Sequence, residues 1–284
     1  MTEAIDNRQS KIDNRIEFPP WYGEFGWEVA SWVPFCRKKA AGYDQVVVTS
    51  FDGMGPLYAD FATEFKTHGQ PHRGLKYQKL YRPPPGGYYK YGRPDEPEFF
   101  FDCLIHARGI PRKNSINYRR WDELLGLMKK MPGTCAVIGS RQDDRVGDLF
   151  DMRGLELQKL MDLISRAKMV IGVSSGLMHL SAFCGTDLVV WGDRRTYFSE
   201  TLEQRYKVTW NPFNVKVGWV DAEYFQPEPE AIAERIREIY ESSTTKYTAA
   251  AGRSDDVHTG GERLQSCSSR HPCRYRLGRA GDVA

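Results

Sequence analysis

Residues 168–192 read KMVIGVSSGLMHLSAFCGTDLVVWG and decide the fold class of this 284-residue chain. Lys168–Val173 and Asp187–Trp191 are predicted to be buried strands, because short apolar runs rich in β-branched residues are typical of parallel sheets. Between them, Gly176–Cys184 is predicted to be a helix that ends at Gly185. A strand, a helix and a second strand in this order indicate a βαβ unit with parallel strands.

The turn before this helix contains Ser174, Ser175 and Gly176. The first N–H groups of a helix lack intrahelical partners and carry a partial positive charge, so this turn is a candidate phosphate-binding site. His179 lies one turn further along and is expected on the same face of the helix. The structural alternative is that the serines only cap the helix and that His179 packs under the sheet.

The alternation of strands and helices continues on both sides of this unit and predicts an α/β fold. The first lobe is expected to have strands at Arg15–Phe18 and Gln45–Ser50, a helix at Trp27–Ala41 that Pro34 kinks or interrupts, and a helix at Leu57–Lys66. The second lobe is expected to have further strands at Phe100–Ala107, Thr134–Gly139 and Tyr206–Trp210, and further helices at Tyr118–Met131, Leu155–Ala167 and Glu228–Glu241. The sequence therefore predicts two Rossmann-like lobes, of which the first is reduced to two clear strands.

Composition divides the chain into three parts: a first lobe at residues 1–98, a second lobe at residues 99–245, and a tail at residues 246–284. The tail is poor in aliphatic residues and is expected to be disordered. It also carries the whole net charge of +3, so the charge of the lobes does not point to nucleic acid. Six scattered cysteines indicate reduced thiols, and no apolar run approaches the roughly 18 residues of a membrane span, so we expect a cytoplasmic protein.

A basic, tyrosine-rich loop is predicted at residues 66–93, which contain no acidic residue. A cationic strip with interleaved aromatic side chains suits a polyanion such as DNA, RNA or a phosphorylated glycan. The candidate acceptor or polyanion contacts are Arg73, Lys76, Lys79 and Arg82. The alternative is a solvated linker whose tyrosines pack on the lobes.

The segment quoted first resembles the donor-binding signature of the ADP-heptose:lipopolysaccharide heptosyltransferases, glycosyltransferase family 9. That signature is a strand, Asp-Ser-Gly, two residues, His, a small-residue helix and Gly-Thr; Ser174 stands where the family has Asp. The resemblance covers roughly residues 100–195 and implies a fold of the GT-B type and a nucleotide-diphosphate sugar as donor. The donor-binding residues that it implies are Arg108, Lys113, Ser174, Ser175, Gly176 and His179.

The resemblance also implies a catalytic base in the first lobe. The family has a Gly-x-Gly-Asp loop with a Pro six residues beyond the Asp, and Gly26-Trp27-Glu28 with Pro34 keeps that spacing. Glu28 would then remove the proton from the acceptor hydroxyl and give inversion, and Glu24 is the rival candidate. The structural alternative for both is a carboxylate that stabilises the start of a helix.

The function predicted from these residues is an inverting glycosyltransferase that needs no metal and no cofactor besides its nucleotide-sugar donor. Its acceptor would be a glycan or a hydroxyl on a modified nucleic-acid base, as in phage DNA. No Asp-x-Asp pair follows a strand, and Cys267, His271 and Cys273 offer too few ligands for a zinc site. The alternatives are another sugar-nucleotide enzyme of the same fold, of the epimerase type, or a non-catalytic polyanion-binding module.

Overall fold

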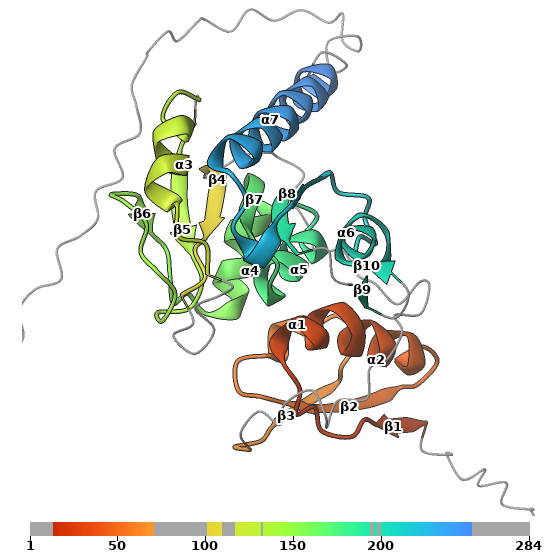
Figure 1. Cartoon of the computed structure of the whole chain (residues 1–284). Helices are drawn as coiled ribbons and strands as arrows, with labels where there is room; N and C mark the ends of the chain where they lie inside the picture. The colour runs from red at the N-terminus through yellow and green to blue at the C-terminus, as the bar shows by residue number, and fades with distance from the viewer. Residues whose placement is uncertain are drawn as a thin grey trace, which may run out of the picture. The chain divides into compact units, whose positions relative to one another are not determined.

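The computed structural model describes residues 14–70, 101–109, 117–131, 133–193, 196–197 and 200–251. Its strands form two parallel sheets and one short antiparallel pair (Figure 1). The first sheet has three strands in the order β1-β2-β3, and the second has six in the order β11-β8-β7-β4-β5-β6. The fold is therefore α/β with two Rossmann-like lobes, the first smaller, as predicted. The predicted lobe boundary near residue 98 lies outside the described residues. The chain also divides into two compact units, residues 1–245 and 246–284, and every contact described below lies within the first.

The first lobe has a third strand where the sequence predicted a helix. Its strands are β1 (Arg15–Glu17), β2 (Gln45–Ser50) and β3 (Glu64–Thr67). The helix predicted over Leu57–Lys66 is wrong: a 3₁₀ turn over Gly55–Leu57 is followed by β3, which pairs with β2 in parallel. Tertiary packing decides this, because Phe65 stacks on the buried Tyr58 at 5.6 Å between ring centroids.

The α-helical pattern is interrupted next to Pro34, as predicted, but the helical segment continues past this residue. The segment begins with α1 (Phe25–Trp27), passes through a π turn at Glu28–Trp32 and continues as α2 (Val33–Ala40). The N–H of Val33 donates to the carbonyl of Glu28, which is the wider i→i−5 pattern. Pro34 therefore falls in the first turn of α2, where a missing N–H costs little.

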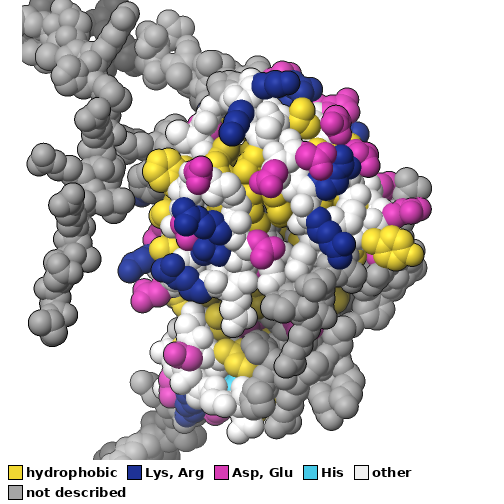
Figure 2. Space-filling model, turned by 60° about the vertical axis from the view of Figure 1, so that its left-hand side comes forward, with side chains coloured by type: hydrophobic (Ala, Val, Ile, Leu, Met, Phe, Trp, Pro, Cys, Tyr) yellow, Lys and Arg dark blue, Asp and Glu magenta, His cyan; other side chains and the backbone are white. Residues whose placement is uncertain are grey.

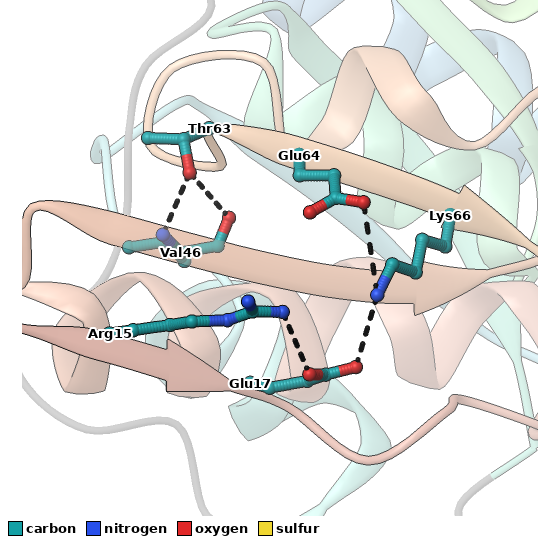
Figure 3. A network of polar contacts seen from close by, with 6 residues as sticks. All are labelled: Arg15, Glu17, Val46, Thr63, Glu64 and Lys66. Carbon is teal, nitrogen blue, oxygen red and sulfur yellow. Dashed lines mark hydrogen bonds and ion pairs between the residues drawn. The ribbon is translucent and has the colours of Figure 1, made fainter. Parts of the chain in front are cut away.

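The helices of the first lobe and the ion pairs between its strands lie on opposite faces of its sheet. Ile16 and Phe65 pack into the helix-covered core, and the residues beside them in the strands alternate to the other face. There Arg15 donates to Glu17 at 3.1 Å, and Lys66 joins Glu17 at 3.3 Å to Glu64 at 3.8 Å (Figure 3). These side chains are largely exposed, so this face is a solvated surface. Exposed ion pairs of this kind contribute little stability.

In the second sheet the order in which strands are added reverses at β4, and this reversal positions the site. Its strands are β4 (Phe101–His106), β5 (Cys135–Ile138), β6 (Phe150–Asp151), β7 (Ala167–Val173), β8 (Asp187–Gly192) and β11 (Val217–Asp221). Its helices are α3 (Trp121–Met128), α4 (Leu157–Ser165), α5 (Gly176–Phe183) and α7 (Pro229–Ala251). From β4 the chain adds strands first on the β5 side and then on the β7 side. Ligands of open α/β sheets bind in the crevice at such a switch point.

The strand predicted at Tyr206–Trp210 is also wrong. A short helix, α6 (Leu202–Gln204), is followed there by a π turn at Arg205–Thr209, and two short strands, β9 (Thr196–Tyr197) and β10 (Glu200–Thr201), precede it. Thr201 and Gln204 form a reciprocal capping box that begins the helix. Tyr206 and Trp210, four residues apart, are both buried, which is the spacing of one helical face. None of the helices in the described ranges is long and apolar enough to cross a bilayer.

Candidate functional site

The carboxyl ends of β4 and β7 meet at the switch point of the second sheet. His106 is the last residue of β4, and its register partner in β7 is Gly172. β7 ends at Val173, and the predicted turn of Ser174, Ser175 and Gly176 follows it directly. The turn that the sequence selected as a phosphate site therefore lies at the place where this class of fold binds ligands.

The hydroxyl of Ser175 does not cap the helix that it precedes. Ser175 occupies the N-cap position of α5 but makes no side-chain hydrogen bond to that helix. Its Oγ lies 3.0 Å from Nδ1 of His106, and its N–H donates to the hydroxyl of Tyr206 at 3.2 Å. Ser174 Oγ lies 3.1 Å from the same tyrosine hydroxyl. The structural alternative of simple capping therefore does not hold for Ser175.

His106 is backed by the carboxylate of Asp143 in the loop after β5. Asp143 Oδ2 lies 3.6 Å from Nε2 of His106 and accepts from the Ser140 N–H at 2.6 Å and the Ser140 hydroxyl at 2.9 Å. Asp143 Oδ1 accepts from the Gly109 N–H at 3.2 Å. Burial opposes ionisation, but the contacts with His106 and these N–H groups outweigh it and hold the pKa of Asp143 well below its usual range.

Arg108 provides positive charge at the same edge of the sheet. Its guanidinium donates to the carbonyl of Ser174 at 3.3 Å. Burial lowers the pKa of Arg108, and the nearby charges of Asp143 and Glu24 oppose that shift. An arginine stays protonated under these conditions, so Arg108 is a cation within electrostatic range of a first-lobe and a second-lobe carboxylate. Lys113, the other predicted cation, lies outside the described residues.

The two lobes touch backbone to backbone beside this turn. A Cβ placed on Gly26 would lie 3.1 Å from Cα of Gly176, and a Cβ on Gly176 would lie 2.8 Å from Cδ1 of Phe25. The backbone at the start of the first-lobe helical segment therefore lies in contact with the backbone at the start of α5. Only glycine fits at Gly176 without a shift of the backbone.

His179 lies beneath the turn in an aromatic cage. Its ring stacks on Tyr206 at 4.9 Å between centroids and meets the edge of Trp210 at 4.4 Å. Burial, with Arg205 nearby, lowers the pKa of His179 to about 3, so the imidazole is neutral at physiological pH. A Cβ on Gly26 would lie 3.4 Å from Cδ2 of this ring, which places His179 next to the contact between the lobes.

The two candidate bases have different environments. Glu28 has no exposed surface, and its Oε1 accepts from the hydroxyls of Ser50 and, at 2.6 Å, Tyr58. Burial raises the pKa of Glu28 to about 7, although both hydroxyls oppose the shift. Glu24 is exposed and close enough to Arg108 to affect its pKa. The sequence ranked Glu28 first, but Glu24 is the one that faces solvent at the lobe contact.

Arg73, Lys76, Lys79 and Arg82 are outside the described residues. A cavity of about 580 Å³ opens beside the start of α3, lined by Asn117, Tyr118, Arg119, Trp121, Asp122, Asp144, Arg145, Val146 and Gly147. In the ranges that the structure describes, no three His, Cys, Asp or Glu side chains are grouped to hold a metal. Figure 2 shows basic and acidic side chains interspersed on one face of the described surface.

Sequence reasoning missed three members of the site: His106, Asp143 and Tyr206. A signal for the first two was present, since His106 is next to last in one predicted strand and Asp143 lies four residues beyond another, at the edge where ligands bind. Tyr206 could not be found, because its stretch was interpreted as a strand.

Comparisons with known proteins agree with this architecture. Residues 153–221 match the family model of glycosyltransferase family 9 (heptosyltransferase). The E. coli ADP-heptose lps heptosyltransferase II is 12% identical, with a TM-score of 0.55 over 81% of this chain and 99% of that chain. The glycosyl transferase family 9 protein of Veillonella parvula DSM 2008 is 10% identical, with a TM-score of 0.55 over 82% of this chain and 97% of that chain. No curated protein matches the chain. The chain therefore has the two-lobe GT-B fold, and its segment 153–221 resembles glycosyltransferase family 9.

Proposed function

We propose that this chain is an inverting glycosyltransferase that moves a sugar from a nucleoside-diphosphate sugar to an acceptor hydroxyl. The observation that carries the proposal is the group at the switch point: an uncapped α5 start, a cation at Arg108 and a carboxylate at Glu24 from the other lobe. The diphosphate, which is the leaving group, would then lie against the second lobe, and the base would come from the first lobe. The match of residues 153–221 to a glycosyltransferase family supports the same reaction class.

The second lobe would hold the donor diphosphate. Backbone N–H groups at the start of α5 and the hydroxyl of Ser175 donate to phosphate oxygens, and Gly176 leaves the backbone open to a close approach. Arg108 adds a charge-assisted contact, because a guanidinium suits phosphate geometry. As the bond between the sugar and the diphosphate breaks, negative charge grows on the diphosphate. These donors stabilise that charge where it develops.

The first lobe would supply the base, and Glu24 suits this role better than Glu28. An acceptor hydroxyl can reach the exposed carboxylate of Glu24, whereas both hydrogen bonds to Glu28 Oε1 come from the lobe's own side chains. As the base takes its proton, the acceptor oxygen bonds to the anomeric carbon on the face opposite the diphosphate, whose bond to that carbon breaks, and the configuration inverts. Glu28 is then a positioning residue that ties the π turn to Ser50 and Tyr58.

The acceptor would be a glycan or a hydroxyl on a modified nucleic-acid base, with Arg73, Lys76, Lys79 and Arg82 as its predicted contacts. Lys113 would add to the donor site, and His179 would support it from below as a neutral ring. We propose a cytoplasmic, metal-independent enzyme that uses no cofactor besides its nucleotide-sugar donor substrate. Retention of turnover after chelation with EDTA would support metal independence.

The test is a panel of nucleoside-diphosphate sugars incubated with the full chain. The expected result is release of one nucleoside diphosphate, faster when the matching acceptor is present, with strong loss in Glu24→Gln. Oligosaccharides and DNA containing hydroxymethylated bases serve as the two acceptor classes. Isomerised sugar nucleotide without release of diphosphate would instead identify an epimerase. Binding of DNA without turnover of any donor would identify a polyanion-binding module.

A further inference from the structure

Three side chains behind the phosphate turn form a continuous polar chain. Ser175 Oγ lies 3.0 Å from Nδ1 of His106, and Nε2 of His106 lies 3.6 Å from Oδ2 of Asp143. The three residues come from the start of α5, the end of β4 and the loop after β5. His106 and Asp143 are 5% and 8% exposed, whereas Ser175 is only partly buried, so the chain opens to ligand at its serine end.

Two glycines make room for this arrangement. Gly139 has φ +134°, and a Cβ there would lie 2.6 Å from Oδ2 of Asp143. A Cβ on Gly172 would lie 3.0 Å from Cβ of His106. With three further donors on the Asp143 carboxylate, the pair is fixed by backbone on several sides. The backbone therefore leaves the space in which these side chains meet.

The protonation state of His106 decides what the serine hydroxyl can do. In the neutral ring with its proton on Nε2, Nδ1 accepts the hydroxyl proton of Ser175, and only oxygen lone pairs face the ligand. In the imidazolium, Nδ1–H donates to Ser175 Oγ, and the hydroxyl proton is free to point outward. A phosphate oxygen accepts such a donor and is repelled by lone pairs, so an anion favours the imidazolium.

We propose that Asp143, His106 and Ser175 form a proton relay that takes up one proton when the donor diphosphate binds and presents the Ser175 hydroxyl to a phosphate oxygen. This rests on the proposed function of the site. One proton passes from solvent to the imidazole, the serine hydroxyl turns from Nδ1 to phosphate, and no covalent bond of the ligand changes. His106 and Asp143 are thus positioning residues that act through Ser175.

The charged group that lies against His106 is Asp143. Further charged and titratable groups surround the relay: Arg153, after β6, donates to the carbonyl of Asp143, Tyr206 accepts from the N–H of Ser175, and Arg108 lies near Asp143 and Glu24. A bound diphosphate adds negative charge to this group, and added negative charge favours the protonated form of a nearby imidazole.

Calorimetry on the full chain tests the relay. Candidate diphosphates are ADP, GDP, UDP and CDP, with inorganic pyrophosphate as a probe without a base. The nucleotide that binds is titrated near pH 7.5 in buffers of different ionisation enthalpy, and the slope of apparent enthalpy gives the protons taken up. On binding, the wild type is expected to gain as much as one proton more than His106→Asn. The asparagine keeps a hydrogen-bonding group near the position of Nδ1 but cannot titrate. The ligand's own protonation cancels in this difference.

Two further variants separate the relay from a loss of structure. Ser175→Ala keeps the His106–Asp143 pair but removes the outward donor, so the excess proton uptake should vanish and affinity should fall about tenfold or more. Asp144→Asn removes a neighbouring carboxylate outside the relay and should keep the wild-type proton count. Equal proton uptake in wild type and His106→Asn would overturn the relay while leaving the donor site intact. If none of the diphosphates binds the wild type, the proposed function itself fails, and the relay with it.

Discussion

Gly26 of the first lobe and Gly176 of the second lobe face each other without side chains between them, so that a Cβ on Gly26 would lie 3.1 Å from Cα of Gly176. This contact joins the segment that carries Glu24 to the turn that carries Ser175. The base and the phosphate site are therefore held in register by backbone, and a small displacement at this point moves one relative to the other.

Gly176→Ala is expected to impair turnover more than donor affinity. The new methyl group would lie 2.8 Å from Phe25 and 2.9 Å from the backbone nitrogen of Gly26, so the two segments must separate. A misplacement of about 1 Å can cost about a hundredfold in rate. Steady-state kinetics should therefore show a large loss in kcat, with a smaller rise in KM for the donor.

Gly126→Ala is the matched control for this variant. Gly126 lies inside α3, and a Cβ there would meet nothing within 4 Å. Alanine is the better helix former by roughly 1 kcal/mol, so this variant should be slightly more stable and equally active. Unchanged kcat in a folded Gly176→Ala would contradict the role given to the lobe contact.

The site could be predicted from the sequence where it depends on one contiguous segment. Ser174–Gly176 and His179 could be selected as candidates because a strand, a turn and a helix follow one another there, and the structure has this unit as predicted. His106 and Asp143 join Ser175 only through the strand order β7-β4-β5, which periodicity does not reveal. Leu57–Lys66 and Tyr206–Trp210 were assigned wrongly because packing of Phe65 and Tyr206 overrode local propensity. Glu28 was ranked above Glu24 on spacing, and spacing carries no information on which carboxylate is buried.

Glu24→Gln is expected to remove the chemistry and leave the donor bound. Glutamine keeps the shape of the side chain but cannot take the acceptor proton, which typically costs ~10²–10⁴ in rate. Donor affinity by calorimetry should change by less than about threefold, or ~0.7 kcal/mol. In Glu28→Gln the chemical step should persist, because Glu28 holds Ser50 and Tyr58 rather than the acceptor. The opposite ranking of the two variants in kcat would return the base to Glu28.

Reversal of charge in the basic strip tests the class of acceptor. If Lys76, Lys79 and Arg82 contact a nucleic acid, their replacement by glutamate should weaken binding and flatten its dependence on salt, because fewer counterions are released. Mobility shifts with single- and double-stranded DNA at several salt concentrations measure this. An absence of binding by the wild type even at low salt would leave a glycan as the acceptor, and the triple variant should then transfer sugar to oligosaccharide at an altered KM.

Glu28 is expected to make the stability of the fold depend on pH near neutrality. Its pKa is about 7 in the folded chain and near 4.5 when exposed, because burial disfavours the charged form. Between these values the folded state binds a proton that the unfolded state has released, so the free energy of unfolding falls as pH rises from 4.5 through 7. The full difference is on the order of 3 kcal/mol. Glu28→Gln carries no such proton, and the gap between its urea-unfolding free energy and that of the wild type should therefore grow in favour of the variant from pH 5 to pH 8. Glu24→Gln removes an exposed carboxyl and should follow the wild-type curve. A constant gap between wild type and Glu28→Gln across this range would show that the carboxyl of Glu28 is not protonated in the folded chain at neutral pH.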